Sequence, residues 1–295
     1  MAVKFLDAKR LQGTNAERLG MNLGVTPTAP TVDTTTASGY VILKYLSGIG
    51  TFTPTSTTTV EYLVVGGGSG GNTGVNGVSY GSGGAGGQLK SSSSYSVTAQ
   101  NYDITVGDGG AGVVYATSNA GGSSVFGSIT ATGGGSIANS SLQGASNADY
   151  SGSTDTGIYG GGGASSSENG KTSGNGGDGT ANSITGTSIY YATGAGGGAP
   201  EGIQGIGGSS EGNDGSWSAT AGSGINGRGS GGGSTGSGGT AGAGGSGIVV
   251  LKFADSVSYS YATVATNLPS GTIFSTTDTY KYYWWNGTDT WSESG

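Results

Sequence analysis

The sequence predicts a mostly irregular and β fold: a sandwich of polyglycine II helices bracketed by β-strands, with a small C-terminal β-hairpin module. Three observations support this fold class. The chain of 295 residues contains 68 glycines. Of these, 59 lie in residues 66–247, 6 in residues 1–65 and 3 in residues 248–295. Runs rich in β-branched residues stand directly on both sides of the glycine-rich region.

The glycine distribution divides the chain into three expected domains. Residues 1–30 are expected to form an attachment arm and linker, in which a capping box at 14–17 indicates a short helix. Residues 31–254 are expected to form the glycine-rich domain with its bracketing strands. Residues 255–295 are expected to form the C-terminal hairpin module.

Strands are predicted on both sides of the glycine-rich region. "GYVILKYL" (39–46) and "TTTVEYLVV" (57–65) precede it, and "SGIVVLKFA" (246–254) follows it. Pairing between these strands would bring the two ends of the region together, which a flexible linker does not require. Inside the region, shorter β signals occur in "YSVTAQNYDITVG" (95–107) and "SSVFGSITATGG" (123–134).

The glycine clusters raise the question of what would hold them in place. Ordering a residue costs about 1–2 kcal/mol of backbone entropy, and glycine loses the most. Either the region stays disordered or its backbone forms the core. In a left-handed helix with about three residues per turn, every N–H and C=O is free to bond a neighbouring helix, and only glycine allows close stacking. Glycine clusters separated by turns and anchored by strands favour this ordered lattice.

Composition excludes several classes of function. Charged residues make up 9% of the chain, the net charge is −7, and His and Cys are absent. Nucleic-acid binding would need a basic patch, and membrane insertion a long apolar run, so neither is expected. The first residues lack the apolar core of a signal peptide, so ordinary secretion is not expected. Without His or Cys we expect no enzyme activity, no metal site and no cofactor.

Two short motifs resemble ligand-binding loops but lack the required context. "SENGKT" (167–172) has Ser165 where a P-loop has glycine, and no apolar strand precedes it. "GNGGDGTAN" (174–182) offers a single Asp178, whereas calcium-binding repeats need tandem copies. Both are expected to be polar loops.

Four segments in chain order carry a family resemblance. "TVEYLVVGGGSGG", "YDITVGDGGAG", "SSVFGSITATGGG" and "GAGGSGIVVLKF" together resemble the glycine-rich domain of bacteriophage tail-fibre tip adhesins and related viral surface proteins. The resemblance covers residues 39–254. It implies a polyglycine II sandwich on the virion surface, assembled in the host cytoplasm, whose distal loops bind a host-cell receptor, either protein or glycan. The receptor's identity is not implied, because those loops vary.

Aromatic side chains mark the expected contact surface. The longest segments between glycine clusters are 136–159, 180–193 and 209–221, and Tyr and Trp in such polar loops suit binding. The alternative is that these rings cover exposed faces of the lattice. The candidate receptor-contact residues are Tyr150, Tyr159, Tyr190, Tyr191 and Trp217.

The C-terminal module contains a two-residue hairpin signal, Asn286–Gly287, between "YKYYWW" and "TDTW". Its tryptophans are candidates for stacking on sugars. The alternative is that they form a small core or an oligomer contact, because so short a segment needs its aromatic residues to fold. These residues are Trp284, Trp285 and Trp291.

The sequence therefore predicts a virion surface protein, a tail-fibre tip or fibre adhesin that binds a host-cell receptor and docks on other virion proteins through residues 1–30. The alternative is a purely structural virion protein, a capsid decoration or filament subunit, whose lattice and termini mediate assembly. The sequence is compatible with a homo-oligomer in either case. An ice-binding role would need regular Thr spacing on one face, which the sequence lacks.

Overall fold

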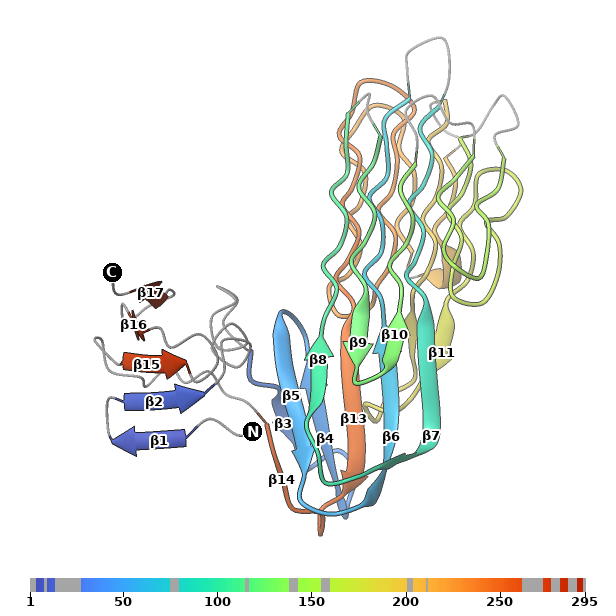
Figure 1. Ribbon diagram of the computed structural model, residues 1–295. Helices are drawn as coiled ribbons and strands as arrows, with labels where there is room; N and C mark the ends of the chain where they lie inside the picture. Colours follow the sequence, from blue (N-terminus) through green and yellow to red (C-terminus); the bar gives the residue numbers. More distant parts are fainter. Residues whose placement is uncertain are drawn as a thin grey trace. The chain divides into compact units, whose positions relative to one another are not determined.

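The chain forms two compact units (Figure 1). The terminal unit comprises Met1–Ala29, Gly48–Gly50 and Tyr261–Gly295, and the glycine-rich unit comprises Pro30–Ser47 and Thr51–Ser260. The structure is a computed structural model that describes residues 4–7, 10–13, 28–74, 80–114, 117–137, 143–154, 160–200, 204–210, 212–261, 273–276, 282–285 and 291–293.

The strands expected to bracket the glycine region form the centre of one antiparallel sheet. β13 pairs with β4 through Leu251↔Leu43 and with β6 through Leu251↔Tyr62. The predicted pairing of strands from both sides of the region is therefore confirmed. The order across this sheet is β3 (Thr31–Asp33), β4 (Tyr40–Tyr45), β13 (Ile248–Ala254), β6 (Thr58–Val65) and β7 (Leu89–Val97).

A second five-stranded sheet uses the shorter β signals. The signals at 95–107 and 123–134 are confirmed, since they contain β8 and the β9–β10 hairpin. β5 was not predicted from the sequence; its alternating "IGTFTP" places Phe52 in the core at 0% exposure. The order across this sheet is β10 (Ile129–Ala131), β9 (Ser124–Phe126), β8 (Tyr102–Thr105), β5 (Ile49–Pro54) and β14 (Tyr259–Ser260).

The main apolar core contains residues from both sheets. Aromatic rings fill its centre: the Phe52 and Phe253 centroids lie 5.3 Å apart and those of Phe253 and Tyr259 lie 4.9 Å apart. Each fully buried large side chain contributes about 1.5–3 kcal/mol. This core anchors both ends of the glycine region. Its other large members are Val41, Leu43, Tyr45, Val60, Val64, Tyr102, Ile104, Phe126, Val249 and Leu251.

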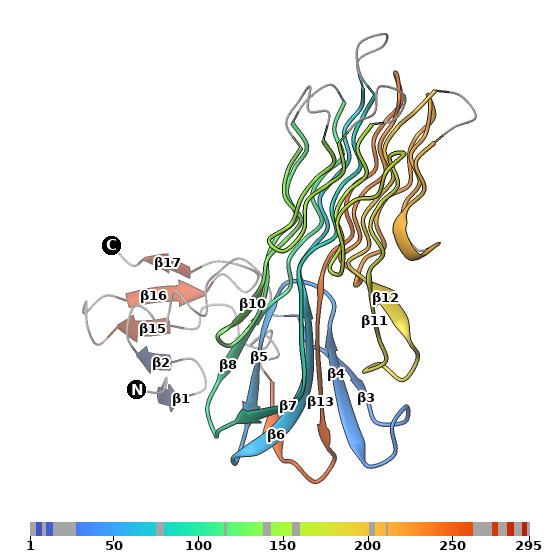
Figure 2. The same ribbon diagram turned by 90° about the vertical axis from the view of Figure 1, so that its right-hand side faces the viewer.

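A hairpin from inside the glycine region covers the opposite face of the first sheet. β11 (Thr180–Asn182) and β12 (Ile189–Tyr191) pair antiparallel. Figure 2 places this hairpin and the β8–β10 strands on opposite sides of β6 and β13. Ile184 and Tyr191 pack there against the second set of alternating sheet residues, Ile42, Leu63, Val65, Ile248 and Val250.

The glycine-rich segments continue from the strands and are held by hydrogen bonds between backbones (Figure 1). The backbone N–H groups of residues 66–72 donate hydrogen bonds to three neighbouring segments in turn. Every third residue therefore bonds to the same segment. Segment 81–87 repeats the pattern, because its residues at spacings of three donate to Thr235, Gly232 and Gly229. For 66–72, the donors and acceptors are Gly66 to Gln88, Gly67 to Gly122, Gly68 to Gly245, Ser69 to Ala85, Gly70 to Asn119, Gly71 to Gly242 and Asn72 to Ser82.

Helix is almost absent from the part of the chain that the structure describes. Its one helical element there is the three-residue η1 (Gly208–Ser210). The short helix predicted from the capping box at 14–17 lies outside the described residues. The prediction of a chain made mostly of β-strands and irregular segments is confirmed for the described residues.

The terminal unit contains one sheet made from both ends of the chain. β2 pairs antiparallel with β1 and parallel with β15, and β16 lies between β15 and β17. The segments expected to be a separate arm and a separate C-terminal module thus share backbone hydrogen bonds. The strands are β1 (Lys4–Asp7), β2 (Arg10–Gly13), β15 (Ile273–Thr276), β16 (Tyr282–Trp285) and β17 (Trp291–Glu293).

The C-terminal hairpin forms with a different connection from the one predicted. β16 and β17 pair antiparallel, and Trp285 is opposite Trp291. Five residues therefore separate the paired positions, where Asn286–Gly287 predicted a two-residue turn. The side chains of these strands lie outside the described part of the structure.

Candidate functional site

The glycine-rich segments turn back at the end away from the strands, and we call this the distal end (Figure 1). Bridges join neighbouring segments there: Asn72 with Val113, and Thr235 with both Thr73 and Ser216. The Thr235 hydroxyl also donates to that of Thr73 at 3.1 Å, and both side chains are buried. Side-chain hydroxyls thus reinforce the backbone bonds near the distal end.

Among the predicted contact residues that the structure describes, Trp217 lies at the distal end. It directly follows Ser216, and its ring centroid is 6.3 Å from that of Tyr80. Both rings are half-buried. The Trp217 ring also lies against Gly236, where a Cβ atom would be 2.8 Å from it. The pair Tyr80–Trp217 is therefore an aromatic surface held against the glycine segments.

Tyr150 lies near the sheet, at the end of the glycine-rich segments opposite the distal end. The carboxylate of Asp149 accepts two hydrogen bonds, at 3.0 and 2.9 Å, from the side-chain amide of Gln88, the residue directly before β7. Tyr150 is half-buried and packs against a small apolar cluster that includes Ala85 and Ile137. The segment 136–159 therefore has a turn at the sheet end, and Tyr159 lies outside the described residues.

The segment 180–193 is the β11–β12 hairpin, which covers the first sheet. Tyr191 is 2% exposed and belongs to the core there, whereas the adjacent Tyr190 is 41% exposed. Tyr191 is therefore a core residue of the hairpin and presents no surface to a receptor. The contact segments were predicted from their length between glycine clusters. The length of a segment does not indicate which end of the glycine-rich unit it occupies.

The two rejected motifs meet in one polar cluster. The Lys171 amine lies 2.6 Å from a carboxylate oxygen of Asp178 and 3.0 Å from Glu168. The Asp178 carboxylate also accepts a hydrogen bond from the backbone N–H of Ser209. The bond from Lys171 holds the pKa of Asp178 below its ordinary value, and the same contact raises the pKa of Lys171. This cluster ties three turns together and leaves Lys171 engaged with carboxylates.

No metal site is found among the described residues, since no three His, Cys, Asp or Glu side chains there are placed to hold an ion. In the same part of the chain, no helix has the length and apolar character needed to cross a membrane.

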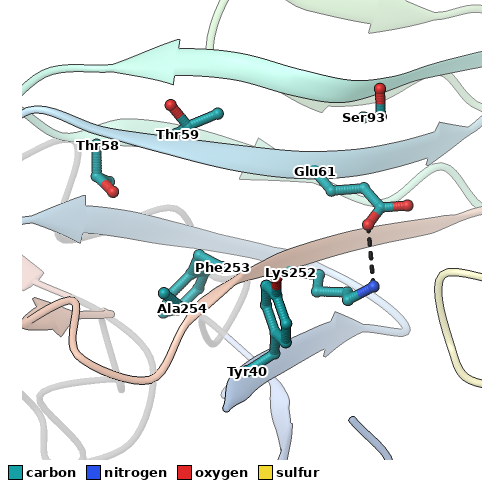
Figure 3. A pocket seen from close by; sticks show the side chains of 8 residues that line it. All are labelled: Tyr40, Thr58, Thr59, Glu61, Ser93, Lys252, Phe253 and Ala254. Atoms are coloured by element: carbon teal, nitrogen blue, oxygen red, sulfur yellow. Dashed lines mark hydrogen bonds and ion pairs between the residues drawn. The ribbon is translucent and has the colours of Figure 1, made fainter. Parts of the chain in front are cut away.

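The first sheet carries a groove that was not predicted from the sequence. Pairing of β6 with β13 ends at Lys252↔Glu61. Beyond that pair, β6 continues to Thr58 beside β7, and β13 continues to Ala254 beside β4. The two strands are no longer paired, and a cavity of about 530 Å³ lies there (Figure 3).

Three side chains from adjacent strands meet in the groove. The Lys252 amine lies 3.1 Å from a carboxylate oxygen of Glu61 and 5.1 Å from the centre of the Tyr40 ring. Figure 3 shows these three groups together, with Thr58 and Thr59 on β6, the strand that also carries Glu61. The sequence contains a signal for this site, because single charged residues interrupt the apolar runs "VEYLVV" and "IVVLKFA".

The fold and these surfaces define a glycine-rich protein. Its glycine-rich segments are joined by backbone hydrogen bonds and continue from the strands of a β-sandwich. Residues 47–254 match the glycine-rich domain family. This match covers more than half of the chain, and the chain belongs to that family. A comparison with curated proteins found no match.

Proposed function

We propose that the glycine-rich segments are polyglycine II helices stacked as a sandwich. The support is the rotation of hydrogen bonds in 66–72, where every third residue faces the same neighbouring segment. A helix with three residues per turn has this property, whereas a β-strand alternates with a period of two. A crystal structure tests the proposal, because polyglycine II requires a rise of about 3.1 Å per residue along each segment.

We propose that the protein is a virion surface protein, a tail-fibre tip or fibre adhesin that binds a host-cell receptor through distal loops. One observation carries this proposal: the aromatic pair Tyr80–Trp217 lies at the distal end, on segments fixed by backbone hydrogen bonds. Contact side chains on a rigid support lose little entropy on binding. Tyr150, Tyr159 and Tyr190 remain predicted contact residues outside this pair.

Immunogold electron microscopy of virus from the source material tests the location. An antibody against the glycine-rich unit is expected to label the ends of tails or fibres. Labelling over a capsid or along a filament would reject the adhesin in favour of a structural role. Absence of label from every particle would reject both.

Adsorption to host cells then tests the distal surface. Virus carrying Trp217→Ala is expected to adsorb at least about tenfold more weakly, since a central aromatic contact is worth about 2 kcal/mol or more. Leu46→Ala is the matched control, because Leu46 is a large exposed residue, at 48%, in the loop after β4. Equal adsorption of the two variants would remove Trp217 from the contact surface.

The second candidate is a structural virion protein, and the sheet built from both chain ends favours it. Parallel pairing of β15 with β2 makes one folded unit from residues 4–13 and 273–293. We propose that this unit docks on other virion proteins. When residues 1–13 are deleted, we then expect virus particles to assemble without the truncated protein. The Trp217→Ala protein is expected to be incorporated normally.

A further inference from the structure

We propose that the groove between β6 and β13 binds a neutral pyranose unit of a glycan. This inference goes beyond the proposed function, because the groove lies on the β-sandwich and shares no residue with the distal pair Tyr80–Trp217. Its cavity of about 530 Å³ falls within the range of small-molecule sites, about 300–1,000 Å³.

The groove offers the kinds of contact that a sugar ring needs. Tyr40 is 46% exposed and supplies an aromatic surface against which the C–H face of a pyranose can pack. Glu61, Thr58, Thr59 and Ser93 also line the groove, with one carboxylate and three hydroxyls among their side chains. Carboxylates accept hydrogen bonds, and hydroxyls both donate and accept them, as sugar hydroxyls require.

The charges in the groove favour a neutral ligand. Glu61 and Lys252 form an ion pair at 3.1 Å, so their charges cancel within the site. A charged sugar would have to compete with that pair for either partner, whereas a neutral hydroxyl can bond to both while the pair stays intact. The Tyr40 ring near Lys252 further fixes the amine, which reduces the entropy lost when it donates to a ligand.

The groove is also preorganised by the fold. Tyr40, Glu61 and Lys252 lie on three adjacent strands, and the next residues along those strands, Val41, Val60 and Phe253, are buried in the main core. Sites on regular elements keep their geometry better than sites on loops. The strands hold the site open, because their pairing stops at the ion pair.

Saturation-transfer NMR on the full-length protein tests this proposal. The probes are glucose, galactose and N-acetylglucosamine, with glucuronic acid and glucosamine as charged comparators. At least one neutral sugar is expected to bind, with a Kd of roughly 1 mM. Tyr40→Ala is expected to weaken this binding about tenfold, which corresponds to the loss of about 1.4 kcal/mol of binding free energy from the aromatic contact. Glu61→Gln is expected to weaken it too.

Matched variants separate groove binding from loss of the fold. Asp33→Asn removes a carboxylate from a similar ion pair on the same sheet, 3.0 Å from Lys44, and Leu46→Ala truncates an equally exposed residue; both are expected to bind sugar normally. Thermal unfolding verifies that every variant is folded. Three results would each overturn the proposal: no neutral sugar binds, a charged sugar binds more tightly, or folded Tyr40→Ala binds as well as the native protein. Loss of Trp217 affects only the adsorption assay, so the two proposals fail independently.

Discussion

At most of its described glycines, the glycine-rich unit has no space for a Cβ atom because the neighbouring segments meet backbone to backbone. Gly84 donates to the carbonyl of Gly232 at 2.9 Å, and a Cβ on it would overlap the carbonyl oxygen of Ser69. Backbone on a hydrogen-bonded segment cannot move aside as a flexible side chain can. The glycine clusters are therefore a packing requirement of this unit.

We expect Gly84→Ala to lower the free energy of unfolding by about 3 kcal/mol or more, at the upper end of overpacking effects. Gly238→Ala is the control: Gly238 has φ +69° and nothing within 4 Å of an added Cβ. Its backbone conformation alone should cost about 1 kcal/mol. Urea denaturation measures both, and equal losses would show that close approach of the backbones is unimportant.

The contact between Lys171 and Asp178 makes stability depend on pH. Its bond with Lys171 holds the pKa of Asp178 below the ordinary value of 3.8 in the folded protein. A depressed carboxyl pKa contributes stability that is complete above the unfolded pKa and is lost as the pH falls through the folded pKa. Both side chains are well exposed, at 40% and 44%, so the contribution at neutral pH is about 0.5 kcal/mol.

Asp178→Asn is therefore expected to be less stable than the native protein at neutral pH, and the difference should shrink below about pH 4. Urea denaturation at a series of pH values measures this difference. A gap that stays constant on acidification would mean that the charge of Asp178 does not contribute.

At the level of elements, the β11–β12 hairpin closes the second face of the first sheet, and its two adjacent tyrosines have opposite environments. Tyr191→Ala is expected to cost about 3–5 kcal/mol, as for other large buried aromatic residues. Tyr190→Ala should stay within about 0.5 kcal/mol, because Tyr190 is 41% exposed. Thermal unfolding of the matched pair measures this; similar losses would contradict the packing of the hairpin on the sheet.

In the terminal unit, we expect the N-terminal and C-terminal strands to depend on each other for folding, because β2 pairs with β15. Deleting residues 1–13 removes β1 and β2, so that β15 loses its parallel neighbour. The C-terminal segment after residue 260 should then become sensitive to protease, while the glycine-rich unit stays resistant. Deleting residues 1–3 alone, before β1, is the control. Continued resistance of the C-terminal segment in the longer deletion would show that its hairpin folds without the N-terminal strands.

Elements with a local signal were predicted from the sequence, and so was the pairing of the strands that bracket the glycine region, whereas the other long-range neighbours were not. The β-branched runs that became β4, β6 and β13 were recognisable because period-two patterns and bracketing glycines are local. β5 was missed because "IGTFTP" carries only two large apolar residues, Ile49 and Phe52, and the burial of Phe52 depends on the opposite sheet. The pairing of β2 with β15 leaves no local trace, since it joins segments at opposite ends of the chain.

The candidate site was predicted less well, for a related reason. Loop composition identified Trp217, which lies at the distal end, but it gave the same weight to Tyr191, which is buried. A turn lies at the sheet end or at the distal end according to the number of segments that precede it. Each turn missed in the sequence therefore places all later turns at the wrong end. The groove formed by Tyr40, Glu61 and Lys252 depends on where strand pairing stops, which no single strand encodes.

For the whole molecule, the order of the strands explains how a region poor in apolar side chains is held in place. β13 follows the last glycine segment and lies between β4 and β6, which precede the first one. The apolar core therefore closes over the two ends of the same region, and the segments between them gain one another's backbone as partners. The stability of the glycine segments then depends on β13 as well as on their own hydrogen bonds.

Two truncations test this dependence. A chain ending at residue 260 keeps β13 and β14 and should retain the glycine-rich unit, which ends at Ser260. A chain ending at residue 247 loses β13, the central strand of the first sheet, with Val249, Leu251 and Phe253 of the core. We expect it to be digested rapidly throughout residues 66–247, whereas the longer chain resists. If the shorter chain resisted equally, the glycine segments would be stable through their own hydrogen bonds, and the β-sandwich would serve only to join them.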